Sequence, residues 1–412
     1  MKKTILPLIM SAAAAVSTYA AIPANITEDC SGEILRGANY TIMADDVTVT
    51  HLHTGARHYV GTFNLNGHSA TLVLSTSTST PTTAYFAFDR SLPEGEATLK
   101  GNSAADVLDI KIADGKDPAY VICGFIVDSA TVNMGLGLVN ADRTKTVDVI
   151  NGGVLNWTGV AANGSYDKMK LAFNVGNSAS DNSKVVFKTA SLAWFPGVKM
   201  TVNGGTFDLD AKSGRFTFSQ VDIKNLSADA KVSYMGVDVN GTFNIDSGIA
   251  HKILSVSPYI AVYENATLKF STENAVMRSN GDAIGLEFGG TAKTANFVMG
   301  ATQTINEIRV NGAAATLNLS LNGNEFTLLN ADFSKLSIVI DDFDNNLFRW
   351  KNGTVDLSKI TAIHDGITLG DLTTKIVGDY TYLFSASIPE PATVAAVFGA
   401  LALGLALHRR RK

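Results

Sequence analysis

Residues Val198 to Leu209 read VKMTVNGGTFDL, and this stretch decides the fold class. Apolar side chains alternate with polar ones before and after Asn203-Gly204, which is the period of a half-buried β-strand. Asn and Gly both tolerate a positive φ angle, so the dipeptide marks a sharp corner. The stretch therefore predicts a strand, a corner and a second strand.

The same unit recurs along the chain with variable spacing. From about residue 34 to 385 there is little helical periodicity, and short alternating runs are bounded by Gly and Asn, which predicts an all-β body. Successive corners at positions 151, 203, 240, 311 and 352 are unevenly spaced, so the repeat has no fixed period. The Asn-Gly corners include Asn66-Gly67, Asn151-Gly152, Asn240-Gly241, Asn311-Gly312 and Asn352-Gly353.

An Asn-Gly corner is compatible with two folds. A tight hairpin would give antiparallel β-sandwich domains, whereas a solenoid bend would stack each strand on its equivalent one coil later. The units resemble one another, Asn, Ser and Thr punctuate them, and the aromatic pattern of a sandwich is missing from the sequence. We therefore predict a parallel β-helix, or β-solenoid, over residues 21–385, closed by residues 330–385, with antiparallel β-sandwich domains as the alternative.

The first 20 residues are typical of a Sec signal peptide. Lys2 and Lys3 precede an apolar run from Ile5 to Val16, which is followed by the small-residue cleavage site Thr18-Tyr19-Ala20. We expect export through the Sec translocon and removal of this segment by signal peptidase.

The chain ends in an apolar run and a basic cluster. As a transmembrane helix, residues 392–407 would reach about 24 Å, so they could cross the ~30 Å hydrocarbon core with local thinning of the bilayer. Positive charge stays in the cytoplasm, which places the body outside the membrane. The residues expected to stop and orient the helix are Arg409, Arg410, Arg411 and Lys412.

Pro389, Glu390 and Pro391 stand directly before this apolar run, and the two prolines keep the segment extended. In this order, Pro-Glu-Pro, the apolar helix and the Arg cluster resemble the PEP-CTERM sorting signal of Gram-negative bacteria, over about residues 388–412. The resemblance implies recognition by an exosortase, a membrane protease-transpeptidase. It also implies transient anchoring in the inner membrane and delivery to the cell envelope, cell surface or extracellular matrix, often alongside exopolysaccharide. An ordinary C-terminal membrane anchor is the alternative, with the same topology.

Two short segments carry a second resemblance. Gly205 to Leu209 (GTFDL) and Gly241 to Ile245 (GTFNI) are similar to repeats in autotransporter passenger domains and other exported β-solenoid proteins. This similarity favours the solenoid and transfers no functional residue.

The exported body is acidic. Between Ile22 and Ile388 there are 27 Lys and Arg residues (33 minus 6) and 37 Asp and Glu residues (38 minus 1), which gives a net charge of −10. A negative body argues against binding to nucleic acid or to anionic lipid.

Two cysteines, Cys30 and Cys123, would lie in an oxidising compartment. They could form a disulfide that ties the N-terminal segment to a later strand, or remain two separately buried thiols, because only geometry decides between these states. Their spacing matches no metal-binding motif, and we expect no cofactor.

Two polar segments are candidates for metal binding. Four of the seven histidines, His51, His53, His58 and His68, lie close together in sequence, and the first two would share one face of a strand. We expect exposed histidines there and no metal site. The oxygen-rich segment 341–346 lacks the central Gly and distal Glu of an EF-hand loop, so we expect a solvated turn.

Catalytic motifs such as the Gly-x-Ser-x-Gly elbow, the P-loop and the dinucleotide fingerprint are missing from the sequence. We therefore expect a noncatalytic, structural or adhesive protein of the envelope or matrix that contacts exopolysaccharide or other glycans. The alternative is a carbohydrate-active enzyme, a polysaccharide lyase or a glycosidase, on a β-helix scaffold. An enzyme should gather several carboxylates and an Arg or Lys along one groove, whereas a structural rod should spread its polar residues evenly. Three or more convergent ionisable side chains would therefore count against the noncatalytic expectation.

Overall fold

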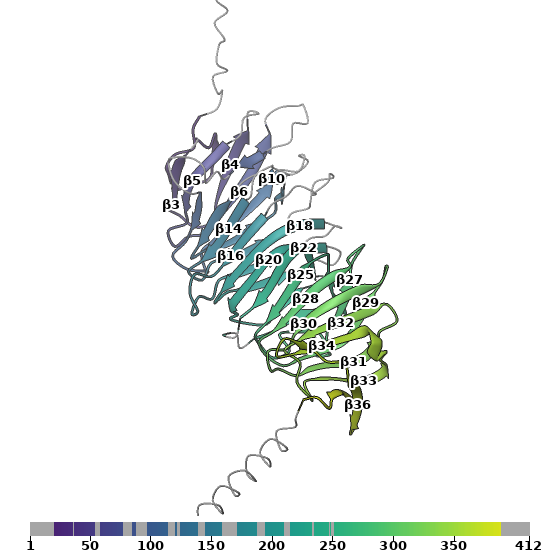
Figure 1. The fold of residues 1–412 in the computed structure, drawn as a ribbon. Coiled ribbons are helices and arrows are strands. Elements are labelled where there is room, and N and C mark those ends of the chain that lie inside the picture. The colour runs from purple at the N-terminus through teal and green to yellow at the C-terminus, as the bar shows by residue number, and fades with distance from the viewer. Residues whose placement is uncertain are drawn as a thin grey trace, which may run out of the picture.

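The computed structural model describes residues 20–388 except 36, 54–57, 77–84, 88–96, 114–119, 122–123, 139–144, 159–170, 188–193, 210–214, 233–234, 247 and 249–250. Over this range the chain winds into a parallel β-solenoid of about 11 turns (Figure 1). Successive coils stack from the purple N-terminal end to the yellow C-terminal end (Figure 1). The predicted β-solenoid is confirmed, and the sandwich alternative is excluded because the stacked strands pair in parallel.

The first face of the solenoid is one continuous stack in which each strand pairs with its equivalent in the next coil. Its strands are β1 (Asn25–Ile26), β3 (Ala38–Ile42), β5 (His58–Asn64), β8 (Thr98–Lys100), β11 (Phe125–Asp128), β14 (Lys145–Ile150), β16 (Leu171–Val175), β18 (Trp194–Asn203), β20 (Arg215–Asn225), β22 (Met235–Ile245), β25 (Ala266–Phe270), β28 (Thr294–Met299), β30 (Ala315–Ser320), β32 (Leu336–Asp341) and β34 (Ile360–His364).

The second face follows the first across a corner and is an 11-stranded parallel sheet. Its strands are β2 (Cys30–Gly32), β4 (Val47–His53), β6 (Ala70–Thr76), β9 (Val107–Ile112), β12 (Thr131–Met134), β15 (Val154–Trp157), β17 (Lys184–Phe187), β19 (Thr206–Leu209), β21 (Ala230–Val232), β23 (Ile253–Ser255) and β26 (Val276–Arg278). In the later coils, β29 (Gln303–Val310), β31 (Phe326–Asp332) and β33 (Phe348–Thr354) pair in parallel.

A third face lies between the second face and the first face of the following coil. It contains β7 (Tyr85–Ala87), β10 (Tyr120–Val121), β13 (Gly137–Leu138), β24 (Tyr259–Val262) and β27 (Gly285–Phe288). Long strands bend from this face to a neighbouring one: the first half of β22 pairs with β24 and its second half with β25. Likewise, the end of β29 pairs with β27 and its beginning with β31.

The core is built by the inward side chains of these alternating strands. In β30 the side chains of Leu317 and Leu319 are buried while the residues between them are half-buried, which is the expected period of two. Stacking also aligns aromatic rings from successive coils: Phe243, Phe270 and Phe297 pack edge to face with centroid separations of 5.5 and 5.2 Å. This geometry adds about 0.5–1.5 kcal/mol per pair to the hydrophobic burial.

Polar side chains also stack, on the outside of the coils. Asn318 donates to Asn296 at 2.9 Å, and on another rung Asn174 donates to Asp148 at 2.7 Å. Such pairs join residues that are directly opposed in neighbouring strands. They satisfy the Asn and Asp side chains that alternate with the core residues in sequence.

The Asn-Gly dipeptides occupy more than one position in the coil, which explains their irregular spacing. Asn66 and Asn151, with φ of 52° and 56°, turn the chain from the first face to the second. Asn240, with φ of 56°, lies instead where β22 bends toward the first face. Asn352-Gly353 lies within β33, where both residues pair with β31, and Gly353 has φ of 95°.

Strand register shows that the coils also differ in length. Asn318 of β30 pairs with Val339 in the next coil, whereas Thr267 of β25 pairs with Asn296. The sequence separation between Thr267 and Asn296 is larger than that between Asn318 and Val339, because the coil between β25 and β28 contains longer connections. A fixed sequence period is therefore not required by the stack.

The C-terminal end is closed by antiparallel strands. After the short 3-10 helix η1 (Leu357–Lys359) and β34, the chain forms β35 (Ile367–Thr368), β36 (Leu372–Val377) and β37 (Tyr380–Ser385). Within the expected closing range of 330–385, β32, β33 and β34 still extend the parallel stack, and antiparallel pairing begins with Ile363 and Thr368. Strand β37 pairs antiparallel with both β36 and β33, and β36 lies at the far C-terminal end (Figure 1).

Arg349 fastens this closing hairpin to the last coils. Its guanidinium donates to Tyr382 Oη at 2.8 Å and to Thr327 Oγ1 at 2.9 Å, and it forms an ion pair with Glu325. The ring centroid of Tyr380 lies 4.4 Å from the guanidinium carbon. A cation between an aromatic ring and a carboxylate therefore holds β37 against β33.

Candidate functional site

The predicted sorting and topology residues lie outside the described residues. These are the signal peptide apart from Ala20, the motif Pro389, Glu390 and Pro391, the apolar run 392–407, and the basic residues Arg409, Arg410, Arg411 and Lys412. Within residues 20–388, with the gaps given above, no helix is long and apolar enough to cross a membrane.

The residues immediately before Pro389 are fixed to the end of the solenoid by a group that we call the C-terminal clasp: Asn345, Asp371, Ser385, Ser387 and Ile388. Asn345 is 8% exposed. Its amide group donates to the carbonyl oxygens of Ser385 and Ile388 at 3.0 and 3.1 Å and accepts from the Ser385 N–H at 2.8 Å. The side chain of Ile388 is itself buried. The chain is therefore held by the folded body up to the residue that precedes the predicted motif.

A carboxylate completes the clasp. Asp371 accepts hydrogen bonds from the Ser385 hydroxyl at 2.6 Å and from the Ser387 N–H at 2.8 Å. The hydrogen bond from the Ser385 hydroxyl, and to a smaller extent those from Ser387, hold the pKa of Asp371 below its ordinary value. Asp371 is thus ionised at neutral pH, where a carboxylate is the stronger acceptor.

The clasp corrects the expectation for residues 341–346. This oxygen-rich segment was expected to be a solvated turn, but Phe343 and Asn345 are both buried. Asn345 uses its amide on the backbone of residues 385–388, so the segment anchors the C-terminal end of the body. A single Asn in an acidic run gives no local signal for a partner so far away in sequence.

A second candidate site lies on the third face, where ionisable side chains from three coils converge. Tyr259 on β24 donates its phenol hydrogen to the carboxylate of Glu307 on β29. The guanidinium carbon of Arg309 lies 5.7 Å from the Tyr259 ring centroid, and Arg309 pairs with Glu287 on β27 at 3.7 Å. We call Tyr259, Tyr263, Glu287, Glu307 and Arg309 the tyrosine–carboxylate cluster.

Glycines let the two tyrosine rings lie against the next coil. Gly285 is the register partner of Tyr259, and a Cβ at Gly285 would lie only 2.5 Å from Tyr259 Cδ1. Tyr263 lies in the same way over Gly289, where a Cβ would come within 3.0 Å of Tyr263 Cε1. Because the position between Tyr259 and Glu307 has no side chain, the phenol can reach a carboxylate two coils away.

The chemistry of the tyrosine–carboxylate cluster is that of a hydrogen-bonding surface. The hydrogen bond to Glu307, aided by burial, raises the pKa of Tyr259, so the phenol remains protonated and acts as a donor. Arg309 is about half exposed, and the Glu287 side chain is partly exposed. Three or more ionisable side chains converge here, which is the arrangement expected for the enzyme alternative, and the noncatalytic expectation stays a prediction.

Sequence reasoning missed this cluster. Its members are spread along the chain from Tyr259 to Arg309 and form no local motif. The signal that could have found them is the coil register, which aligns Tyr259 with Gly285 and Glu287 with Arg309.

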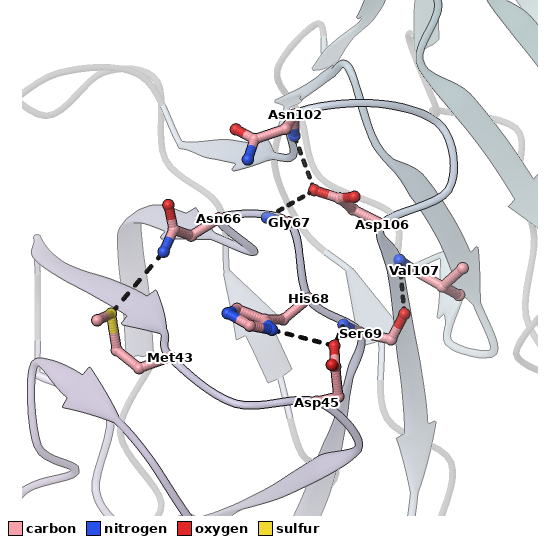
Figure 2. A network of polar contacts seen from close by, with 9 residues as sticks. All are labelled: Met43, Asp45, Asn66, Gly67, His68, Ser69, Asn102, Asp106 and Val107. Atoms are coloured by element: carbon pink, nitrogen blue, oxygen red, sulfur yellow. Dashed lines mark hydrogen bonds and ion pairs between the residues drawn. The ribbon is translucent and has the colours of Figure 1, made fainter.

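The corner at Asn66-Gly67 contains a polar network with a structural role (Figure 2). Asp106, in the following coil, accepts from the N–H groups of Gly67 and Asn102 at 2.9 and 2.8 Å (Figure 2). Asp181 has the same role at the corner formed by Asn151-Gly152, where it accepts from the Gly152 N–H at 2.9 Å. Buried carboxylates thus satisfy the backbone donors that the sharp corners leave open.

The structure divides the four clustered histidines. His68 binds the carboxylate of Asp45 at 3.0 Å beside the Asn66-Gly67 corner (Figure 2). His51 is buried, and its Nδ1 accepts from the Ile34 N–H at 3.1 Å, so the expectation of an exposed side chain is wrong there. The side chains of His53 and His58 lie outside the described residues. Among the side chains that the structure does describe, no group of three or more potential ligands is placed to hold a metal ion.

Cys30 lies on β2 as a half-buried thiol. Burial, followed by the nearby charges of Asp29 and Glu28, raises the pKa of this thiol. Cys123 lies outside the described residues, so the disulfide between the two cysteines stays a prediction.

Comparison of the chain with protein-family models, with curated proteins and with solved structures gave no match.

Proposed function

We propose that this chain is an exported, noncatalytic β-solenoid of the cell envelope or extracellular matrix, sorted through a PEP-CTERM tail. The observation that carries the proposal is the order of features along the chain: a Sec-type leader, a solenoid and a Pro-Glu-Pro tail. The C-terminal clasp supports it, because the folded body reaches Ile388 and leaves Pro389, Glu390 and Pro391 as the next residues.

The proposed partners follow from the same order. The Sec translocon and signal peptidase would handle the leader, and an exosortase-type membrane enzyme would recognise residues 389–391. Arg409 to Lys412 would hold the C-terminus in the cytoplasm while the body folds outside. The acidic body would repel nucleic acid, and its stacked Asn and Asp side chains offer hydrogen bonds to exopolysaccharide or other glycans.

The sorting proposal is tested by fractionation of cells with and without the sorting enzyme, combined with C-terminal mass spectrometry of the chain. We expect the tail beyond the motif to be lost only when the enzyme is present. A variant with Pro389, Glu390 and Pro391 replaced by Ala should retain the tail in both strains, and Glu273→Gln, at an exposed carboxylate in the body, serves as the matched control. A full-length tail in both strains for the unmodified chain would leave an ordinary membrane anchor.

A carbohydrate-active enzyme is the second candidate, and the tyrosine–carboxylate cluster favours it. Two carboxylates, an Arg and a protonated phenol are the kinds of groups that an acid–base reaction on a sugar requires. The test is release of reducing ends or unsaturated products from polysaccharides by the full-length chain. Loss of that release in both Glu287→Gln and Glu307→Gln would establish the enzyme, whereas no release by the unmodified chain would leave the noncatalytic proposal in place.

A further inference from the structure

We propose that the tyrosine–carboxylate cluster is a binding site for a neutral, hydroxyl-rich polysaccharide. This inference rests on the proposed glycan contact of an exported protein and assigns that contact to one surface and one class of polymer.

The surface of the cluster carries two tyrosine rings on one side of the third face. Tyr259 and Tyr263 are four positions apart on and just after β24, so they project from the same side of the strand, about 13 Å apart along it. Each ring lies over a glycine of the next coil, Gly285 or Gly289, and both side chains remain partly exposed. The two tyrosine rings, each packed on a glycine, can therefore act as stacking platforms at the two ends of a short binding track from Tyr259 to Tyr263.

Exposed aromatic rings of this kind stack against sugar rings. The face of an aromatic ring carries partial negative charge, and the C–H bonds on one side of a pyranose ring carry partial positive charge. A sugar chain presents these C–H groups at regular intervals, so it can stack on rings separated along a track. A flexible peptide or a lipid headgroup lacks that regular array.

Polar groups lie beside the two tyrosine rings. Glu287 and Arg309 are register partners on adjacent strands, and Glu307 lies on the same strand as Arg309. Carboxylate oxygens accept hydrogen bonds from two neighbouring hydroxyls, while the guanidinium donates to a ring or hydroxyl oxygen. The track therefore offers acceptors and donors to a polyol.

Charge selects a neutral polymer over an acidic one. Two carboxylates and one guanidinium give the cluster a formal charge of −1, and the body around it carries −10. A polyuronate or sulfated glycan would bring its own negative charges next to Glu287 and Glu307 and would be repelled. A neutral chain meets no such repulsion.

The test is affinity electrophoresis of the full-length chain in gels that contain dextran, hydroxyethyl cellulose or polygalacturonate. We expect retardation by at least one neutral polymer and none by polygalacturonate. Tyr263→Ala should weaken the neutral interaction about tenfold, the effect of losing one aromatic platform. Glu287→Gln should weaken it less, and Glu273→Gln, an exposed carboxylate in another corner, should leave it unchanged.

Folding is monitored by the thermal midpoint of the circular dichroism signal, and Tyr259→Phe provides a milder variant that keeps the ring but loses the bond to Glu307. Absence of binding to both neutral polymers would overturn the inference, as would stronger binding to polygalacturonate. Full binding by a folded Tyr263→Ala/Glu287→Gln double variant would overturn it too. These outcomes concern the purified chain, so they are distinct from a failure of the sorting proposal, which would be seen as a retained tail in cells.

Discussion

The C-terminal clasp allows a prediction of local stability, made with the substitution Asn345→Ala. The change removes three hydrogen bonds at once and leaves the Ser385 N–H, the Ser385 carbonyl and the Ile388 carbonyl without their buried partner. A buried polar group left unsatisfied costs about 1–3 kcal/mol. The clasp is close to solvent, so we take the lower value, about 1 kcal/mol, for each of the three groups. The predicted loss of local stability is then about 3 kcal/mol.

This loss should be local. Each coil of a solenoid contacts only its neighbours, and the clasp lies at one end, so opening of residues 385–388 need not unfold the stack. Since every 1.4 kcal/mol is a tenfold change, the opening equilibrium should rise about 100-fold. Hydrogen exchange at the Ser385 and Ser387 amides measures this directly, and limited proteolysis near residue 388 should accelerate with it.

The matched control for the clasp is Asn352→Ala. Asn352 is exposed and its amide donates to Asn330 at 3.3 Å and to the Leu329 carbonyl at 3.1 Å, so its removal should leave exchange at Ser385 unchanged. Unchanged exchange and proteolysis in Asn345→Ala itself would refute the reasoning, because it would mean that residues 385–388 are held by other contacts.

Three further predictions concern the core, the corners and the tyrosine–carboxylate cluster. Phe270→Ala should lower the free energy of unfolding by about 3–5 kcal/mol, measured by urea denaturation, whereas Ile376→Ala, at a side chain that is 76% exposed, should change it by no more than about 0.5 kcal/mol. An equal effect of the two would contradict the assigned core. Asp181 tests the corners: burial acts to raise its pKa, but hydrogen bonds from Ser183, Gly152 and Asn177 lower it overall. Its stabilising effect should therefore be complete above about pH 4 and be lost as the pH falls through the lowered value, so the stability gap between the unmodified chain and Asp181→Asn should narrow in acid. A gap that stays constant with pH would argue against an ionised corner carboxylate. Gly285→Ala should displace the Tyr259 ring, weaken neutral-glycan binding and leave the sorting of the chain unchanged; unchanged binding to the neutral polymers would argue that Gly285 does not seat the Tyr259 ring.

The sequence predicts the solenoid because its two physical requirements are local. Alternation in stretches such as residues 198–209 specifies which side chains face inward, and Asn or Gly at positive φ specifies the corners. The coil length was not predictable, because one dipeptide serves different positions: Asn151-Gly152 is a corner, while Asn352-Gly353 lies within a strand.

The candidate sites depend on contacts between coils, and the alternation of residues within one stretch of sequence does not show which coils are in contact. Tyr259 needs Gly285 beneath it and Glu307 two coils away, so the cluster emerges only from strand register. Asn345 was expected in a solvated turn because its neighbours are acidic, yet its partner is the backbone at the far end of the closing hairpin. His51 was also expected to be exposed, but it faces the core because Val47, Val49 and His51 share one side of β4.

The antiparallel closure changes how the C-terminal end of the stack can pair with other strands. In a stack of parallel coils, the last coil can pair its backbone N–H and C=O groups with a similar coil of another copy, so the stack could grow by addition of further copies. Here β37 pairs with a section of β33 while running in the opposite direction, and β36 beyond it carries Lys375, a charged residue of the type that discourages edge pairing. Copies of the chain are thereby discouraged from adding head to tail into fibres at this end.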